Sequence, residues 1–148
     1  AMLEVPGRAM EACCPNQAGP VADPLGTALS GYTATIHATD EAASTVSLAG
    51  LPIGYEISPG DLWSVSYGSN PVRQGLHRFV EGGTASSIGR TNALTVVPHI
   101  RPGLLVGATI ELVRPWCKAV LVPGTVSYGS RVNGITSGLG FQFQQTLR

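Results

Sequence analysis

Ser58-Pro59-Gly60-Asp61-Leu62-Trp63-Ser64-Val65-Ser66-Tyr67 is the stretch that decides the fold. Proline is preset for the second position of a tight turn and the following glycine can take a positive φ, so the stretch opens with a turn. Gly60 and Asp61 are therefore predicted as structural turn residues, with the carboxylate accepting a hydrogen bond from a nearby backbone amide. The alternation after them predicts a strand over 62–67, whose polar face carries Ser64 and Ser66 and whose core face carries Trp63, Val65 and Tyr67.

Short strands and tight turns continue on both sides of this stretch. Alternation predicts one hairpin from 32–39 and 45–49, and a second in which 75–81 returns along 62–67. Further strands are expected near 93–97, 108–113 and 119–122, with a closing or flanking strand at 140–147 and an exposed loop at 82–92. About eight or nine short strands without a long helix predict an all-β fold, a small antiparallel β-barrel, with a two-sheet β-sandwich as the alternative.

The chain has 148 residues, the length of one domain with one appendage. Residues 1–27 show little periodicity and contain four prolines, which predicts an irregular N-terminal arm with at most a short helix around Ala9 to Cys13. This arm is expected to pack on a neighbouring subunit or to lie loosely over its own barrel. Residues 28–148 are predicted as a single β domain, with its core barrel at about 32–115 and flanking strands from Trp116 onward. Ala1 before Met2 resembles the remnant of a purification tag.

Charge and hydropathy exclude several classes of partner. Nine basic residues balance nine acidic ones, so no nucleic-acid partner is expected. Only 12% of the residues are charged, against about a quarter in a typical soluble domain, which indicates either surfaces that partners cover or a merely neutral domain. No run of about twenty apolar residues and no signal peptide is present, so no membrane insertion is predicted.

Cysteines and histidines predict neither a disulfide framework nor a metal site. Cys13 and Cys14 are adjacent and Cys117 stands alone, which favours reduced thiols made in a cytoplasm, while a bridge from the pair to Cys117 stays open. Zinc sites in short chains usually draw two ligands from one local motif, whereas the three histidines occur singly on different predicted strands. No metal and no cofactor is therefore expected. The histidines are His37, His77 and His99.

The sequence offers no ordered set of catalytic side chains. A serine hydrolase would combine His77 and Asp61 with a nearby serine, but no Gly-x-Ser-x-Gly elbow is present. Paired carboxylates would draw on Asp61 and Glu81, whose places beside Pro-Gly and Gly-Gly favour turn roles. The region around Gly124, Gly129 and Gly134 has turn spacing and not that of a phosphate-binding loop. The chain is therefore predicted not to be an enzyme.

Interface residues are a separate expectation. Tryptophan and arginine are enriched at binding hot spots, and Trp116 directly follows Arg114-Pro115. Arg73 and Arg78 lie at predicted strand ends, where they suit intersubunit ion pairs. These four residues are the candidate interface, and ordinary core burial of Trp116 is the alternative.

The order of a set of landmarks carries a resemblance to a known family. They are Ala22-Asp-Pro-Leu-Gly26, Gly50-Leu-Pro-Ile-Gly-Tyr55, Gly60-Asp61, Tyr67-Gly68, Leu76-His-Arg78, Glu81, Pro98-His-Ile-Arg-Pro-Gly103, Gly107, Arg114-Pro115 and Pro123-Gly124. Between Gly19 and Leu147 the chain resembles a module of phage and prophage tail proteins of the distal tail or tail assembly type. The resemblance implies a noncatalytic structural role near the tail tip. It also implies other tail proteins as partners, a homo-oligomer as a further option, and a place in the virion tail after assembly from the bacterial cytoplasm.

Two other functions stay open. The first is a carbohydrate- or host-surface-binding β module, in which aromatic rings would stack on sugars; the candidates are Trp63, Trp116, Tyr32 and Tyr128. The second is a hydrolase that uses His77.

Overall fold

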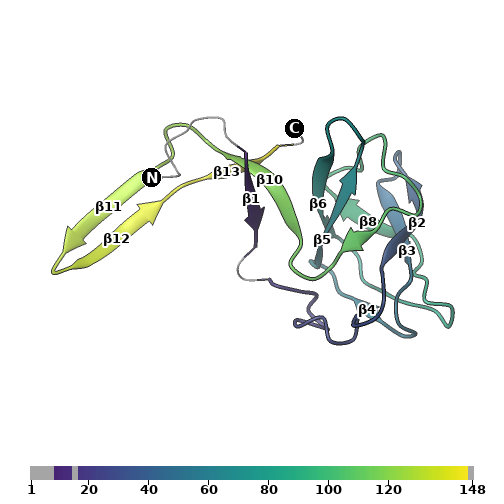
Figure 1. Cartoon of the computed structure of the whole chain (residues 1–148). Coiled ribbons are helices and arrows are strands. Elements are labelled where there is room, and N and C mark those ends of the chain that lie inside the picture. Colours follow the sequence, from purple (N-terminus) through teal and green to yellow (C-terminus); the bar gives the residue numbers. More distant parts are fainter. Residues whose placement is uncertain (1–8, 15–16, 147–148) are drawn as a thin grey trace.

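The computed structural model describes residues 9–14 and 17–146, and every regular element in these ranges is a β-strand (Figure 1). Residues 1–8 of the predicted arm, which include Ala1, and Leu147 of the predicted last strand lie outside the described ranges. The strands are β1 (Met10–Cys13), β2 (Thr35–Asp40), β3 (Thr45–Ala49), β4 (Glu56–Ile57), β5 (Leu62–Tyr67), β6 (Arg73–Phe79), β7 (Gly83–Thr84), β8 (Leu94–Val97), β9 (Ile110–Glu111), β10 (Trp116–Leu121), β11 (Ser127–Val132), β12 (Ile135–Gly140) and β13 (Phe143–Gln145).

Six of these strands form a nearly closed antiparallel barrel. Their order is β2-β3-β8-β6-β5-β9, and a bridge between Thr35 and Thr109 brings the β2 edge back to the β9 edge. Three backbone hydrogen bonds hold this seam: Ile36 N–H to Ala108 C=O at 2.9 Å, Gly107 N–H to Ile36 C=O at 2.7 Å, and Ile110 N–H to Ala34 C=O at 3.0 Å. The barrel prediction is confirmed, because the same sheet curls until its two edges meet, whereas a sandwich keeps two separate sheets.

The barrel interior is filled by the residues that alternation assigned to it. Trp63, Val65 and Tyr67 of β5 are buried, as are Val46 and Leu48 of β3. The Trp63 ring stacks on two neighbours from β6, with ring centroids 4.7 Å from His77 and 5.7 Å from Phe79. Aromatic packing of this kind adds to the burial of apolar area.

A second sheet, β1-β10-β13, covers one side of the barrel (Figure 1). It corrects two expectations. Met10–Cys13, predicted as irregular or briefly helical, is a strand that pairs with 116–119, because pairing satisfies backbone groups that four residues cannot satisfy as a helix. Ser64, predicted on a polar face, is fully buried because its hydroxyl accepts the Trp116 N–H at 3.2 Å.

Two other expectations are corrected in detail. The 82–92 segment is not a plain exposed loop: β7 pairs with β4, and the buried Thr91 hydroxyl accepts the Leu48 N–H at 3.0 Å. The strand expected at 108–113 is limited to 110–111. The last strand, β13, was expected to close or to flank the sheet, and it flanks, pairing with β10 outside the barrel.

The β11–β12 hairpin is the feature that the sequence prediction missed. The turn assignment is confirmed for Gly124, which follows Pro123 in a turn, and for Gly134, which forms the hairpin tip with Asn133 at φ values of 51° and 83°. Gly129 lies within β11. The hairpin projects away from the barrel beyond the β1-β10-β13 sheet (Figure 1).

Candidate functional site

The predicted turn residues behave as expected. Gly60 has φ +95°, a conformation that a β-carbon penalises, and the Asp61 carboxylate accepts the Ser58 N–H at 2.8 Å. Its other oxygen accepts the Val21 N–H at 2.8 Å and the Gln17 Nε2 at 3.4 Å. Asp61 is fully buried with both oxygens bonded, so it holds the turn and the preceding segment together and does not face a cleft.

A second buried carboxylate holds the segment before the barrel. Asp23 accepts the N–H groups of Thr27 at 2.9 Å and Ala28 at 3.1 Å. Both acids act electrostatically on Tyr55, whose buried Oη has no hydrogen-bond partner among the described residues. Burial, followed by the charges of Asp23 and Asp61, raises the pKa of Tyr55 well above its ordinary value of 10.0. The Tyr55 hydroxyl is therefore held in its neutral, protonated form.

The hydrolase set around His77 is not assembled. The His77 ring is buried, stacks on Trp63, and places Nδ1 2.9 Å from the Pro98 carbonyl. Burial is the main cause that lowers the pKa of His77 from its ordinary 6.5; Arg101 adds to the lowering, and the bond to Pro98 opposes it. Ser64 is bonded to Trp116 and Asp61 to backbone amides, so neither presents a group to this imidazole.

The other candidate ligands are dispersed. His37 is exposed on β2 and His99 is exposed after β8. Across the described ranges 9–14 and 17–146, no three His, Cys, Asp or Glu side chains are grouped so that they could hold a metal ion. The thiols of Cys13, Cys14 and Cys117 are free, and burial raises the pKa of Cys117. In the same ranges there is no helix of the length and apolarity needed to cross a membrane.

The four predicted interface residues do not form one patch. Arg73 and Arg78 are exposed but occupy opposite ends of β6, where they pair with Tyr67 and Leu62. Arg114 is exposed with φ 53°, and Trp116 is half-buried in β10 opposite Cys13. Of the aromatic residues proposed for stacking on sugars, Trp63 is fully buried, so it cannot contact a ligand.

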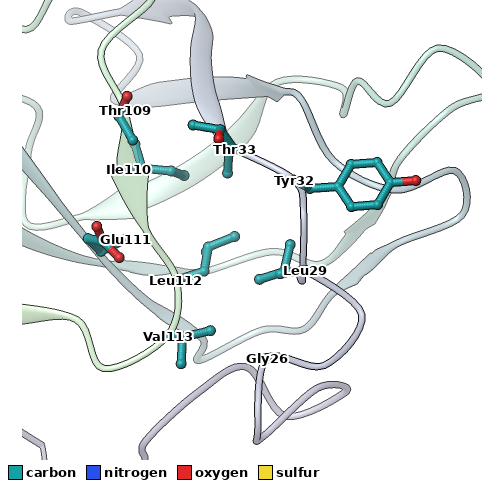
Figure 2. Close-up of a pocket in the computed structure, with 10 residues that line it drawn as sticks. Gly26, Leu29, Tyr32, Thr33, Thr109, Ile110, Glu111, Leu112 and Val113 are labelled. Atoms are coloured by element: carbon teal, nitrogen blue, oxygen red, sulfur yellow. The ribbon is translucent and has the colours of Figure 1, made fainter.

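A cavity of about 450 Å³ lies where the barrel seam opens, and we call it the seam pocket. Across the described residues, the seam hydrogen bonds end at Ile110 and Ala34, and beyond them the two edges separate. Leu29 lies opposite Leu112 and Val113, and the ring of Tyr32 points away from them at the rim (Figure 2). Glu111 is the one charged residue among the ten that line the pocket, which are Gly26, Leu29, Tyr32, Thr33, Ala34, Thr109, Ile110, Glu111, Leu112 and Val113.

The β11–β12 hairpin carries an exposed apolar face, which we call the arm face. Tyr128 lies opposite Leu139 and Val132 opposite Ile135, in one continuous register. Directly opposed residues share a face, and the even spacing along each strand puts both pairs on the same one. These four side chains are between 63% and 75% exposed. Such a contiguous apolar surface is typical of an interaction site.

Sequence reasoning missed both surfaces. The arm face had a local signal, since Asn133-Gly134 with alternating residues on each side favours a two-residue hairpin. The seam pocket had none, because its walls come from 26–34 and 109–113. Comparisons with protein-family models, with curated proteins and with solved structures gave no match to this chain.

Proposed function

We propose that this chain is a noncatalytic structural component of a phage or prophage tail that acts through protein–protein assembly near the tail tip. The observation that carries the proposal is the arm face, an apolar surface on a hairpin that projects from a nearly closed barrel (Figure 1). A rigid body with a projecting apolar element is suited to joining neighbours.

Two further observations support an assembly role. Only 12% of the residues are charged, and the exposed apolar residues include Leu25, Ile53 and Leu105 as well as the arm face. The landmarks from Ala22 to Gly124 resemble a tail protein module, which supplies the tail as the setting. The partners are then other tail proteins, and further copies of this chain are an option. The place of action is the virion tail, reached from the bacterial cytoplasm.

The direct test is to induce particles in the bacterium that carries the gene and to purify them on a density gradient. Mass spectrometry should find this chain in the particle fraction, and gold-labelled antibody should mark one end of the tail. A chain that stays with the soluble proteins while tails assemble normally would contradict the proposal.

A carbohydrate- or host-surface-binding module is the second candidate, and one observation favours it. Tyr32 is 53% exposed at the rim of the seam pocket, where a ring can stack on a sugar. Glycan-array binding that Tyr32→Ala abolishes and Tyr32→Phe keeps would establish this reading, whereas an array without signal would leave assembly as the function.

A further inference from the structure

We infer that the chain binds a small oxyanion that carries a proton, such as hydrogen phosphate or bicarbonate, in a cavity where β13 meets the barrel strands β5 and β6. The cavity has a volume of about 80 Å³, and we call it the imidazole cavity. It shares no residue with the seam pocket. The residues that line it are Tyr67, Gly75, His77, Pro98, Arg101 and Gln145.

The His77 side chain offers this cavity a hydrogen-bond acceptor. Its Nδ1 lies 2.9 Å from the Pro98 carbonyl oxygen. A carbonyl oxygen only accepts hydrogen bonds, so Nδ1 carries the ring proton and Nε2 of the neutral ring keeps its lone pair. Burial lowers the pKa of His77 from its ordinary 6.5, so the ring is neutral at neutral pH. Nε2 is therefore a fixed acceptor.

No group of the described residues uses this acceptor. The one hydrogen bond of the His77 ring is that of Nδ1, and Nε2 has no partner in the described part of the chain. The His77 side chain is only 6% exposed, so little solvent reaches it except through the cavity. A buried acceptor without a partner costs free energy, and a ligand that donates a hydrogen bond to Nε2 removes that cost.

Gly75 keeps the space in front of Nε2 open. A β-carbon on Gly75 would lie 3.1 Å from Nε2 and 3.4 Å from Cε1 of Tyr67. Glycine inside a strand often marks a bulge or the close approach of a ligand. The register between β5 and β6 runs without a shift through the pair of Gly75 and Val65, so no bulge accounts for this glycine. The close approach of a ligand does account for it.

Arg101 supplies the charge that an anion requires. It is the single charged residue among the six that line the cavity, so no carboxylate there repels an anion. Its charge also acts on His77, where it contributes to the lowered pKa. Among the described residues the Arg101 guanidinium has neither an ion pair nor a hydrogen bond. Arginine binds oxyanions well, because its planar fork presents several N–H donors.

The two groups together select the class of ligand. Arg101 requires negatively charged acceptor oxygens, whereas Nε2 requires a donor. Sulfate and acetate have only acceptors at neutral pH, but hydrogen phosphate and bicarbonate carry acceptor oxygens and one O–H. The volume of 80 Å³ corresponds to about three water molecules at roughly 30 Å³ each, which limits the ligand to a few heavy atoms.

The first test compares anions of similar shape that differ in the proton. Isothermal titration calorimetry at mildly alkaline pH and constant ionic strength pairs phosphate with sulfate, and bicarbonate with acetate. In at least one pair the proton-bearing anion should bind saturably and about tenfold or more tightly than its partner, because the partner places a lone pair against Nε2. The pair that responds identifies which of the two oxyanions fits the cavity.

The second test closes the cavity and removes its charge. Gly75→Ala places a methyl group in front of Nε2 and should abolish binding, whereas Gly140→Ala is the matched control, because no atom lies within 4 Å of its β-carbon position. Neither glycine has a positive φ. Arg101→Gln should raise the dissociation constant about tenfold, and Arg73→Gln, an exposed arginine outside the cavity, should leave it unchanged. Circular dichroism checks that all four variants fold.

Nitrogen-15 NMR of the wild-type chain detects the contact without any substitution. Adding the anion should shift the Nε2 resonance of His77 as a hydrogen bond to its lone pair forms, while Nδ1 stays protonated. The exposed His37 and His99 are internal controls, whose resonances should not move.

Three results would overturn the inference. Equal binding of sulfate and phosphate, and of acetate and bicarbonate, would show that Nε2 does not select the ligand. No saturable binding in either pair would leave the cavity to water. Binding that survives Gly75→Ala and shifts His37 or His99 instead of His77 would show an adventitious ion only. None of these results bears on recovery of the chain with tail particles, so the assembly role is tested independently.

Discussion

The buried Asp61 carboxylate accepts a hydrogen bond of 2.8 Å from the backbone N–H of Val21, 40 residues earlier in the chain. Its other oxygen accepts the Ser58 N–H at the same distance. One side chain thus joins the turn before β5 to the segment that precedes the barrel. This contact ties at least Gln17 to Val21 of the predicted arm to its own barrel.

Removing one of the two acceptor oxygens of Asp61 should destabilise the fold. In Asp61→Asn only one oxygen remains, so one of two backbone amides loses its partner and the free energy of unfolding should fall by about 1 to 3 kcal/mol. Asp61→Leu removes both acceptors and should cost more. The matched control is Asp40→Asn, where a single oxygen accepts both turn amides and little change is expected. Urea unfolding measures the free energy of unfolding of all three variants. Equal stability of Asp61→Asn and the wild type would refute the structural role of the buried carboxylate.

The Tyr55 hydroxyl should contribute nothing to stability. It is buried without a partner among the described residues, so Tyr55→Phe should unfold within about 0.5 kcal/mol of the wild type or be more stable. Ser64→Ala is the contrast, because it leaves the Trp116 N–H without its acceptor and should cost about 1 kcal/mol. If Tyr55→Phe proves the more damaging of the two, a bound water or another group satisfies the phenol.

His77 should make stability depend on pH in a defined direction. Its folded-state pKa is lowered below 6.5, so the unfolded chain takes up the proton first. The contribution of neutral His77 to the free energy of unfolding is therefore fully present above pH 6.5. It is lost as the pH falls from 6.5 toward the folded-state pKa. Unfolding of the wild type and of His77→Gln, measured above pH 6.5 and again at acidic pH, isolates the contribution of this one side chain. The difference in unfolding free energy between the two should shrink on acidification, and a difference that grows would contradict the assignment.

The barrel should not need the hairpin. Residues 127–140 are exposed apart from Gly140 and contribute no side chain to the core cluster. Replacing them with a short Gly-Ser turn should leave the melting temperature of a dilute sample nearly unchanged. Cooperative unfolding followed by circular dichroism measures this, and a large drop would show that the hairpin supports the barrel directly.

The parts of the fold that sequence predicted well are those with local causes. The turn at Gly60-Asp61 and the β5 face of Trp63 follow from neighbouring residues alone, through backbone preference and alternation. Ser64 was misplaced because its face is covered by β10, some fifty residues later, which alternation in β5 cannot reveal. Burial of a polar residue such as Ser64 thus depends on a hydrogen bond to a residue distant in the sequence, and not on the residues next to it in the sequence.

The candidate surfaces show the same limit. The arm face was hidden because glycines lower strand propensity, although Asn133-Gly134 marked a hairpin tip. The seam pocket exists only because 26–34 and 109–113 meet at an incomplete seam, and no local pattern in either segment encodes that gap.

The central claim is that the arm face joins this protein to its neighbours. Recovery of the chain with purified tail particles tests it most directly, with the wild type compared with the Val132→Asp, Ile135→Asp double variant. We predict that the wild type is recovered with the particles while the variant, equally folded by circular dichroism, stays with the soluble proteins. Equal recovery of both chains with the particles would contradict the claim.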